Sequence, residues 1–129
     1  MRIAGFVLVF AALPLSSCAT LFGEHSGLVE RLKLGEVGHF GPERITPIAV
    51  DEDSRCPVGS QCIWAGTVRL KVQVYPNARN YANFVTLGQP AVVEGGTLLL
   101  EQVSPQRTST GQIPPNHYTF TLRYIPPAR

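Results

Sequence analysis

Cysteines are the side chains of this sequence whose type and spacing could do chemistry. Five residues, 57–61, separate Cys56 from Cys62. Pro57 and Gly59 within this interval favour a tight turn that would bring the two Cα atoms within disulfide range. The alternative is a redox-active or metal-binding pair. The spacing is not Cys-x-x-Cys, however, and no histidine or lysine lies nearby in the sequence to lower a thiol pKa.

The third cysteine, Cys18, follows a segment with the pattern of an export signal. Arg2 precedes an apolar run over 3–15, which at about thirteen residues is shorter than the roughly twenty that span a bilayer as a helix. The motif Leu15-Ser16-Ser17-Cys18 resembles the lipobox of bacterial lipoproteins. This resemblance implies cleavage before Cys18 and a covalent lipid on its sulfur. An ordinary secretory signal cut nearby, or a short unprocessed anchor, is the alternative.

The signal divides the chain into three parts. We expect a cleaved lipoprotein signal peptide at 1–17, a lipidated N-terminus and tether at 18–27, and a single β domain at 28–129. Export to an oxidising compartment predicts that Cys56 and Cys62 are paired, which would stabilise the fold by roughly 2 kcal/mol on the chain-entropy model. Ala19 follows Cys18, and if the host has two membranes, the lack of Asp at this position resembles a lipoprotein that is sorted onward to the outer membrane. The expected location is therefore the bacterial cell envelope, lipid-anchored on the periplasmic face of the outer membrane.

Charge and motif content argue against several classes of function. The chain contains eleven Lys and Arg and nine Asp and Glu, and no block of like charge occurs. We therefore expect no nucleic-acid partner. The acidic run 51–53 lacks the spacing of an EF-hand, and His25, His39 and His117 are scattered, so we expect no metal and no cofactor beyond the lipid on Cys18. No nucleophile elbow, phosphate loop or zinc-protease motif is present. The hydroxyl-rich segment 104–110 has no base nearby and reads as a loop. We expect no catalytic residues and no enzyme.

Hydrophobic periodicity indicates strands. Apolar residues alternate with polar ones over 68–74 and again over 118–124, and 82–87 and 97–103 read as further strands. Gly95-Gly96 marks a turn, and Pro47 within an apolar stretch suggests an edge strand or a bulge. About seven short strands at intervals of roughly ten residues favour an all-β fold, an antiparallel β-sandwich or small barrel that is immunoglobulin-like in general architecture.

The densest cluster of unusual residues runs from 51 to 66. Asp53-Ser54-Arg55-Cys56-Pro57 and Cys62-Ile63-Trp64-Ala65-Gly66 resemble a group of small exported bacterial proteins and lipoproteins with an Asp-Ser-Arg-Cys-Pro and Cys-x-Trp-Ala-Gly signature. Segments around 96–98, 103–105 and 113–118 are similar to that group too. The resemblance covers most of residues 30–125 and implies export, but no established activity.

Two interpretations of this cluster are open. In the structural one, Trp64 packs over the disulfide inside the sandwich, Asp53 caps the loop or pairs with Arg55, and Gly66 permits a close strand crossing. In the functional one, the loop is an exposed recognition surface with Asp53, Arg55 and Trp64 as its site residues.

These observations together predict a membrane-anchored envelope lipoprotein that acts as a non-catalytic binding or structural module. Its partners would be the membrane, through the lipid anchor, and an envelope protein. The competing prediction is a thiol/disulfide redox or metal-binding envelope protein that works through Cys56 and Cys62.

Overall fold

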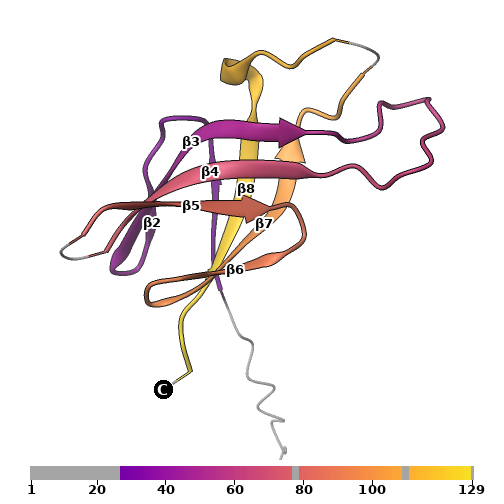
Figure 1. The fold of residues 1–129 in the computed structure, drawn as a ribbon. Coiled ribbons are helices and arrows are strands. Elements are labelled where there is room, and N and C mark those ends of the chain that lie inside the picture. Colours follow the sequence, from indigo (N-terminus) through magenta and orange to yellow (C-terminus); the bar gives the residue numbers. More distant parts are fainter. Residues whose placement is uncertain (1–26, 77–78, 109–110, 129) are drawn as a thin grey trace, which may run out of the picture.

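Two four-stranded antiparallel sheets pack face to face in a β-sandwich (Figure 1). The computed structural model describes residues 27–128 apart from 77–78 and 109–110. The sheet orders are β1-β8-β7-β6 and β2-β3-β4-β5. The predicted all-β sandwich is confirmed, and the sheets do not close into a barrel. The strands are β1 (Leu28–Leu32), β2 (Gly38–Phe40), β3 (Glu43–Asp53), β4 (Val68–Tyr75), β5 (Tyr81–Thr86), β6 (Pro90–Val93), β7 (Gly96–Ser104) and β8 (Thr119–Ile125).

The strands follow one another around the sandwich in chain order. β2 to β5 are consecutive neighbours in one sheet, β6 to β8 are consecutive neighbours in the other, and β1 lies beside β8. The chain crosses between the sheets after β1 and after β5. Among the strands that the structure describes, no hydrogen-bonded ladder joins β1 to β2 or β5 to β6. The sandwich therefore keeps open strand edges at these two corners.

Alternation along the strands produces the core. In β4 the four valine and leucine side chains predicted on one face are fully buried, while Arg69 between them is exposed. In β8 the predicted apolar face is buried likewise. Burying these faces supplies the main favourable contribution to folding. The buried core consists of Leu32, Phe40, Ile45, Val68, Leu70, Val72, Val74, Val85, Val93, Leu98, Leu100, Val103, Tyr118, Phe120, Leu122 and Tyr124.

Pro47 lies within β3, the longest strand. The β3–β4 ladder changes register between Pro47 and Ala49 and again between Val50 and Glu52. A proline has no N–H to donate, and a bulge accommodates that loss. The bulge, one of the two predicted alternatives, is confirmed. The predicted turn is also present: Gly95, with a positive φ of 87°, lies in the turn that joins β6 to β7.

The two ends of the sandwich differ in what they carry. At one end β1 begins, with Leu28 opposite Tyr124 near the end of β8. At the other end the loop 54–67 extends beyond the sheets between β3 and β4 (Figure 1). Cys18, the signal segment 1–17 and residues 18–26 of the tether lie outside the described residues. Within the described part of the chain, no helix is long and apolar enough to cross a membrane.

Candidate functional site

The loop 54–67 begins and ends at a narrow neck. Ser54 N donates to Thr67 O at 2.8 Å, and Thr67 N donates to the Ser54 hydroxyl at 3.1 Å. A Cβ at Gly66 would lie 2.0 Å from Ser54 O, which no side chain can occupy. Glycine at this position therefore allows the outgoing and returning segments of the loop to cross closely, as predicted.

A disulfide closes the next part of the loop. Cys56 and Cys62 are bonded, with their Cα atoms 5.9 Å apart. Between them Ser60 N donates to Pro57 O at 3.1 Å, and Gly59 has a positive φ of 82°. The predicted turn and the predicted pairing are both confirmed. Because the ring is short, it restricts the loop to few conformations.

Asp53 and Arg55 form a partly buried ion pair at the base of the loop. Arg55 Nε donates to Asp53 Oδ1 at 2.9 Å and Arg55 Nη2 donates to Asp53 Oδ2 at 2.7 Å, with the two side chains 14% and 9% exposed. Arg55 Nη1 donates to Val103 O at the end of β7. The Tyr118 hydroxyl donates to Asp53 Oδ2 at 2.8 Å. The pair thus ties the loop to β3, to β7 and to the residue before β8.

The same contacts set the protonation states at the base. Burial raises the pKa of Asp53, but the hydrogen bonds from Arg55 and Tyr118, with the positive charge of Arg55, outweigh that effect and leave the pKa below its ordinary value. Burial, then the hydrogen bond to Asp53 and its charge, raise the pKa of Tyr118 to about 12. At neutral pH the base therefore holds a carboxylate, a guanidinium and a neutral phenol.

Arg107 completes the base, although it lies in the segment that the sequence marks only as a loop. Its Nη1 donates to the carbonyl oxygens of Asp53 and Arg55, each at 3.2 Å. Val58 N donates to Arg107 O at 2.8 Å. Sequence reasoning missed Arg107 and the role of Tyr118. The one available signal was a lone arginine in an otherwise uncharged segment.

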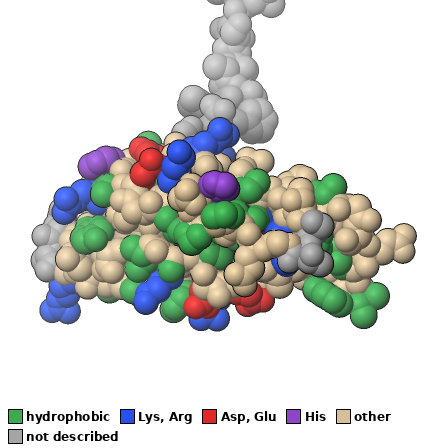
Figure 2. Space-filling model, turned by 90° about the horizontal axis from the view of Figure 1, so that it is seen from above, with side chains coloured by type: hydrophobic (Ala, Val, Ile, Leu, Met, Phe, Trp, Pro, Cys, Tyr) green, Lys and Arg blue, Asp and Glu red, His purple; other side chains and the backbone are tan. Residues whose placement is uncertain are grey.

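The tip of the loop exposes apolar side chains. Ile63 is 97% exposed, and Val58 and Trp64 are each 61% exposed. No charged residue occurs from 56 to 66. Figure 2 shows hydrophobic side chains at the end of the molecule from which the loop projects. The interpretation that Trp64 packs inside the sandwich is wrong, because the neck and the disulfide carry this side chain beyond the sheets. Of the three proposed recognition residues, Trp64 lies at the tip, whereas Asp53 and Arg55 support it from the buried base.

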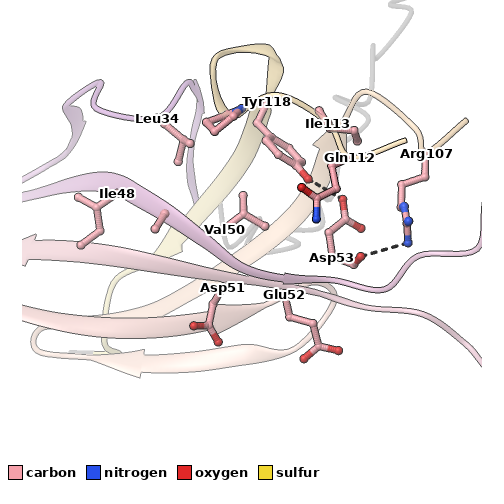
Figure 3. A pocket seen from close by; sticks show the side chains of 12 residues that line it. Leu34, Ile48, Val50, Asp51, Glu52, Asp53, Arg107, Gln112, Ile113 and Tyr118 are labelled. Atoms are coloured by element: carbon pink, nitrogen blue, oxygen red, sulfur yellow. Dashed lines mark hydrogen bonds between the residues drawn. The ribbon is translucent and has the colours of Figure 1, made fainter. Parts of the chain in front are cut away.

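Two clefts flank the base. The first, of about 410 Å³, lies between the second half of β3 and the segment 112–118 (Figure 3). The second, of about 400 Å³, lies on the β7 side and includes Arg55, Val58 and Arg107 in its lining. The base of the loop therefore separates two surface hollows.

The three acidic residues of 51–53 engage different partners. Asp51 pairs with Arg69 at 3.2 Å, Asp53 pairs with Arg55, and the Glu52 carboxylate accepts from the Ser54 hydroxyl. Within residues 27–128, omitting the two short gaps, no three His, Cys, Asp or Glu side chains are grouped closely enough to hold a metal ion. His39 and His117 are exposed and lie on different elements, while His25 is outside the described residues.

Comparison of the chain with protein-family models, with curated proteins and with solved structures finds no match.

Proposed function

We propose that this protein is a lipid-anchored module of the bacterial cell envelope, held at the outer membrane, that binds an envelope protein through the tip of the loop 54–67 and catalyses no reaction. The observation that carries the proposal is the exposure of Ile63, Trp64 and Val58 on a loop fixed by a disulfide and a partly buried ion pair. The lipid on Cys18 belongs to the same proposal.

Exposed apolar side chains on a rigid loop favour binding for two physical reasons. Burying Ile63 and Trp64 against a partner would remove apolar surface from water, and tryptophan is the residue type most enriched at interface positions that dominate affinity. The disulfide and the Asp53–Arg55 pair order the loop before any partner arrives. Less conformational entropy is then lost on association.

The position of the loop relative to the start of β1 favours a protein partner over the anchoring membrane. Leu28 lies opposite Tyr124 at one end of β8, whereas Tyr118, just before the other end, contacts the base of the loop. The seven residues of β8 span about 20 Å. A lipid attached ahead of β1 would hold the start of β1 toward the membrane, with the base of the loop near the opposite end of β8 (Figure 1).

A photocrosslinking amino acid in place of Ile63 tests the proposed binding surface in cells that express the full chain. Val92 is the matched control position, because it is also apolar and is 82% exposed on β6. We expect a discrete crosslinked protein from position 63, none from position 92, and loss of the first when Trp64→Ala is added. Equal crosslinking from both positions, or none from either, would contradict the proposal.

Intact mass spectrometry of protein recovered from membranes tests the anchor and the thiols separately. We expect a chain that begins at Cys18 and carries acyl mass, with two alkylatable thiols that appear only after reduction. An unlipidated chain would remove the anchor from the proposal. Two thiols free before reduction would favour the redox or metal-binding alternative.

A further inference from the structure

One side of β3 is left unpaired along its second half. The ladder between β2 and β3 extends only from Glu43 to Ile45, whereas β3 continues to Asp53. Beyond that ladder, Pro47 O accepts from Gly35 N at 2.7 Å and Asp53 O accepts from Arg107 Nη1 at 3.2 Å. Between these two points, none of the residues that the structure describes hydrogen-bonds to the backbone of 48–52 on this side.

The direction of the free backbone groups follows from the register with β4. Val68 O accepts from Leu87 N, so the backbone N–H and C=O of Val68 point toward the β5 side of β4 and away from β3. These groups alternate in direction along a strand, so those of Leu70, two residues further on, also point away from β3. Their partners across the ladder, Asp53 and Val50, must then direct theirs toward the open edge. The N–H and C=O of Val50 therefore face the first cleft.

The lining of this cleft confirms that β3 presents its edge. Six consecutive residues, 48–53, line it. These six residues include side chains on both faces of the sheet, since Val50 points inward whereas Asp51 and Glu52 point outward. A cleft that touches all six therefore runs along the strand's edge and not over one face. Figure 3 shows Tyr118, Ile113 and Leu34 on the other side of the hollow. The result is a groove about 17 Å long, with a strand edge on one side and apolar side chains on the other.

The second bulge of β3 gives the groove an acidic rim. Because a bulge adds one residue to the strand, Asp51 and Glu52 both point to the outer face, as Figure 3 shows. Both are exposed. Asp51 pairs with Arg69, but no ion pair among the described residues includes Glu52. A basic side chain beside Glu52 would find a complementary charge.

We propose that the groove along the second half of β3 binds an extended peptide segment of another protein, which adds to the sheet as a strand. Alternate side chains of this segment are apolar and contact Leu34, Ile113 and Tyr118. The intervening ones are Lys or Arg and lie beside Asp51 and Glu52. Main-chain hydrogen bonds to an exposed edge provide affinity in this mode, and the alternate side chains provide selectivity.

The ends of the groove and its charge define the ligand further. Gly35 N and Arg107 Nη1 already donate hydrogen bonds to the carbonyl oxygens of Pro47 and Asp53. The bound peptide segment is therefore short, about five residues. A second copy of this chain is a poor occupant, since pairing β3 with β3 would bring the two acidic rims together. This surface is distinct from the loop tip, so the proposal does not depend on partner binding by Ile63 and Trp64.

A fluorescent acetyl-Lys-Val-Lys-Val-Lys-Val-amide peptide provides a direct test with the full chain in a non-ionic detergent, read by anisotropy. Val50 directs its backbone to the open edge and its partly buried side chain inward. The added strand is antiparallel to β3, as in every ladder between the named strands. In this pairing a peptide residue hydrogen-bonded to Val50 also points inward, so the valine N–H groups face β3. We expect N-methylation of the three valines to abolish binding and N-methylation of the three lysines to preserve it.

Variants of the protein separate the groove from non-specific attraction. Reversing the charge of the rim with Asp51→Lys and Glu52→Lys should weaken peptide binding about tenfold at low ionic strength. The control Glu94→Lys, at an exposed position of the β6–β7 turn, should leave peptide binding unchanged. Equal binding of both methylated peptides, or of a Lys-Lys-Lys-Val-Val-Val peptide, would show charge attraction alone and overturn the proposal. No binding up to millimolar peptide would overturn it too, as would sedimentation evidence that the groove is filled by a second copy.

Discussion

The hydroxyl of Tyr118 donates to Asp53 Oδ2 at 2.8 Å and joins two residues that are 65 positions apart in the chain. Asp53 ends β3 and Tyr118 directly precedes β8, so this contact links the two sheets at the end of the sandwich that carries the loop. Arg55 binds the same carboxylate. The exposed loop tip therefore depends on a hydrogen bond whose donor comes from the opposite sheet.

Tyr118→Phe tests this link. Loss of a buried hydrogen bond to a charged group should lower the free energy of unfolding by about 1.5 kcal/mol, measured by urea denaturation. Tyr75→Phe is the matched control, because the Tyr75 hydroxyl makes no hydrogen bond to another residue that the structure describes. If both variants lose equal stability, the contact with Asp53 has no special role in the fold.

Asp53 gives a pH-dependent contribution to stability. Its folded-state pKa lies below the ordinary value of 3.8, so the stabilisation is present above about pH 3.8 and is lost as pH falls through the folded pKa. Asp53→Asn removes the negative charge beside the partly buried Arg55 and should cost about 2 kcal/mol at pH 7. The difference from wild type should shrink as pH falls through the lowered pKa of Asp53, because the wild-type carboxyl then becomes protonated itself. A difference that stays constant from pH 7 to pH 2 would argue against an ionised Asp53 in the folded state.

Glu43 makes the opposite contribution at the far end of the sandwich. It is 6% exposed, and its buried Oε2 has no hydrogen-bond partner among the described residues. Burial, then the charge of Glu94, raise its pKa, so the fold gains most when Glu43 is protonated and loses stability as pH rises through that pKa. Glu43→Gln should therefore raise the unfolding free energy at pH 7 by about 1 kcal/mol and change it little at pH 4.

Glu94→Gln provides a graded comparison for that experiment. Glu94 is exposed and acts on Glu43 only through its charge. Removing this charge should stabilise the fold in the same direction as Glu43→Gln, by a smaller amount. Destabilisation by Glu43→Gln at pH 7 would mean that the carboxylate has a favourable role in the fold.

Gly66→Ala tests the neck of the loop. The added Cβ would meet backbone atoms of Ser54 and Arg55 at 2.0 and 2.4 Å, so the backbone must move and the neighbouring Asp53–Arg55 pair with it. We expect a loss of more than about 2 kcal/mol of unfolding free energy, measured by thermal or urea denaturation. Gly111→Ala is the control, since a Cβ there would meet no atom of the described residues within 4 Å. Similar losses in both variants would contradict the close crossing.

Much of the fold was predictable because its signals are local. The alternation in 68–74 and 118–124 sets which side chains of β4 and β8 face the core, and Gly95 sets a turn. Cys56 and Cys62 are close in the chain, so the turn between them brings them together without help from distant segments. In each case the physical cause lies within about ten residues.

The tertiary structure decided what depends on distant partners. No local pattern places Arg107 against the carbonyl oxygens of Asp53 and Arg55, which lie more than fifty positions earlier. Nor does any local pattern determine that Trp64 points outward and does not pack over the disulfide. The open edge of β3 exists because β2 is short and β3 is long, a difference in pairing that alternation does not encode. The sequence by itself determined the strands over 68–74 and 118–124 and which of their faces is apolar. Only the packing of one sheet on the other determined which backbone edges and side chains remain available, because that availability depends on which elements happen to cover them.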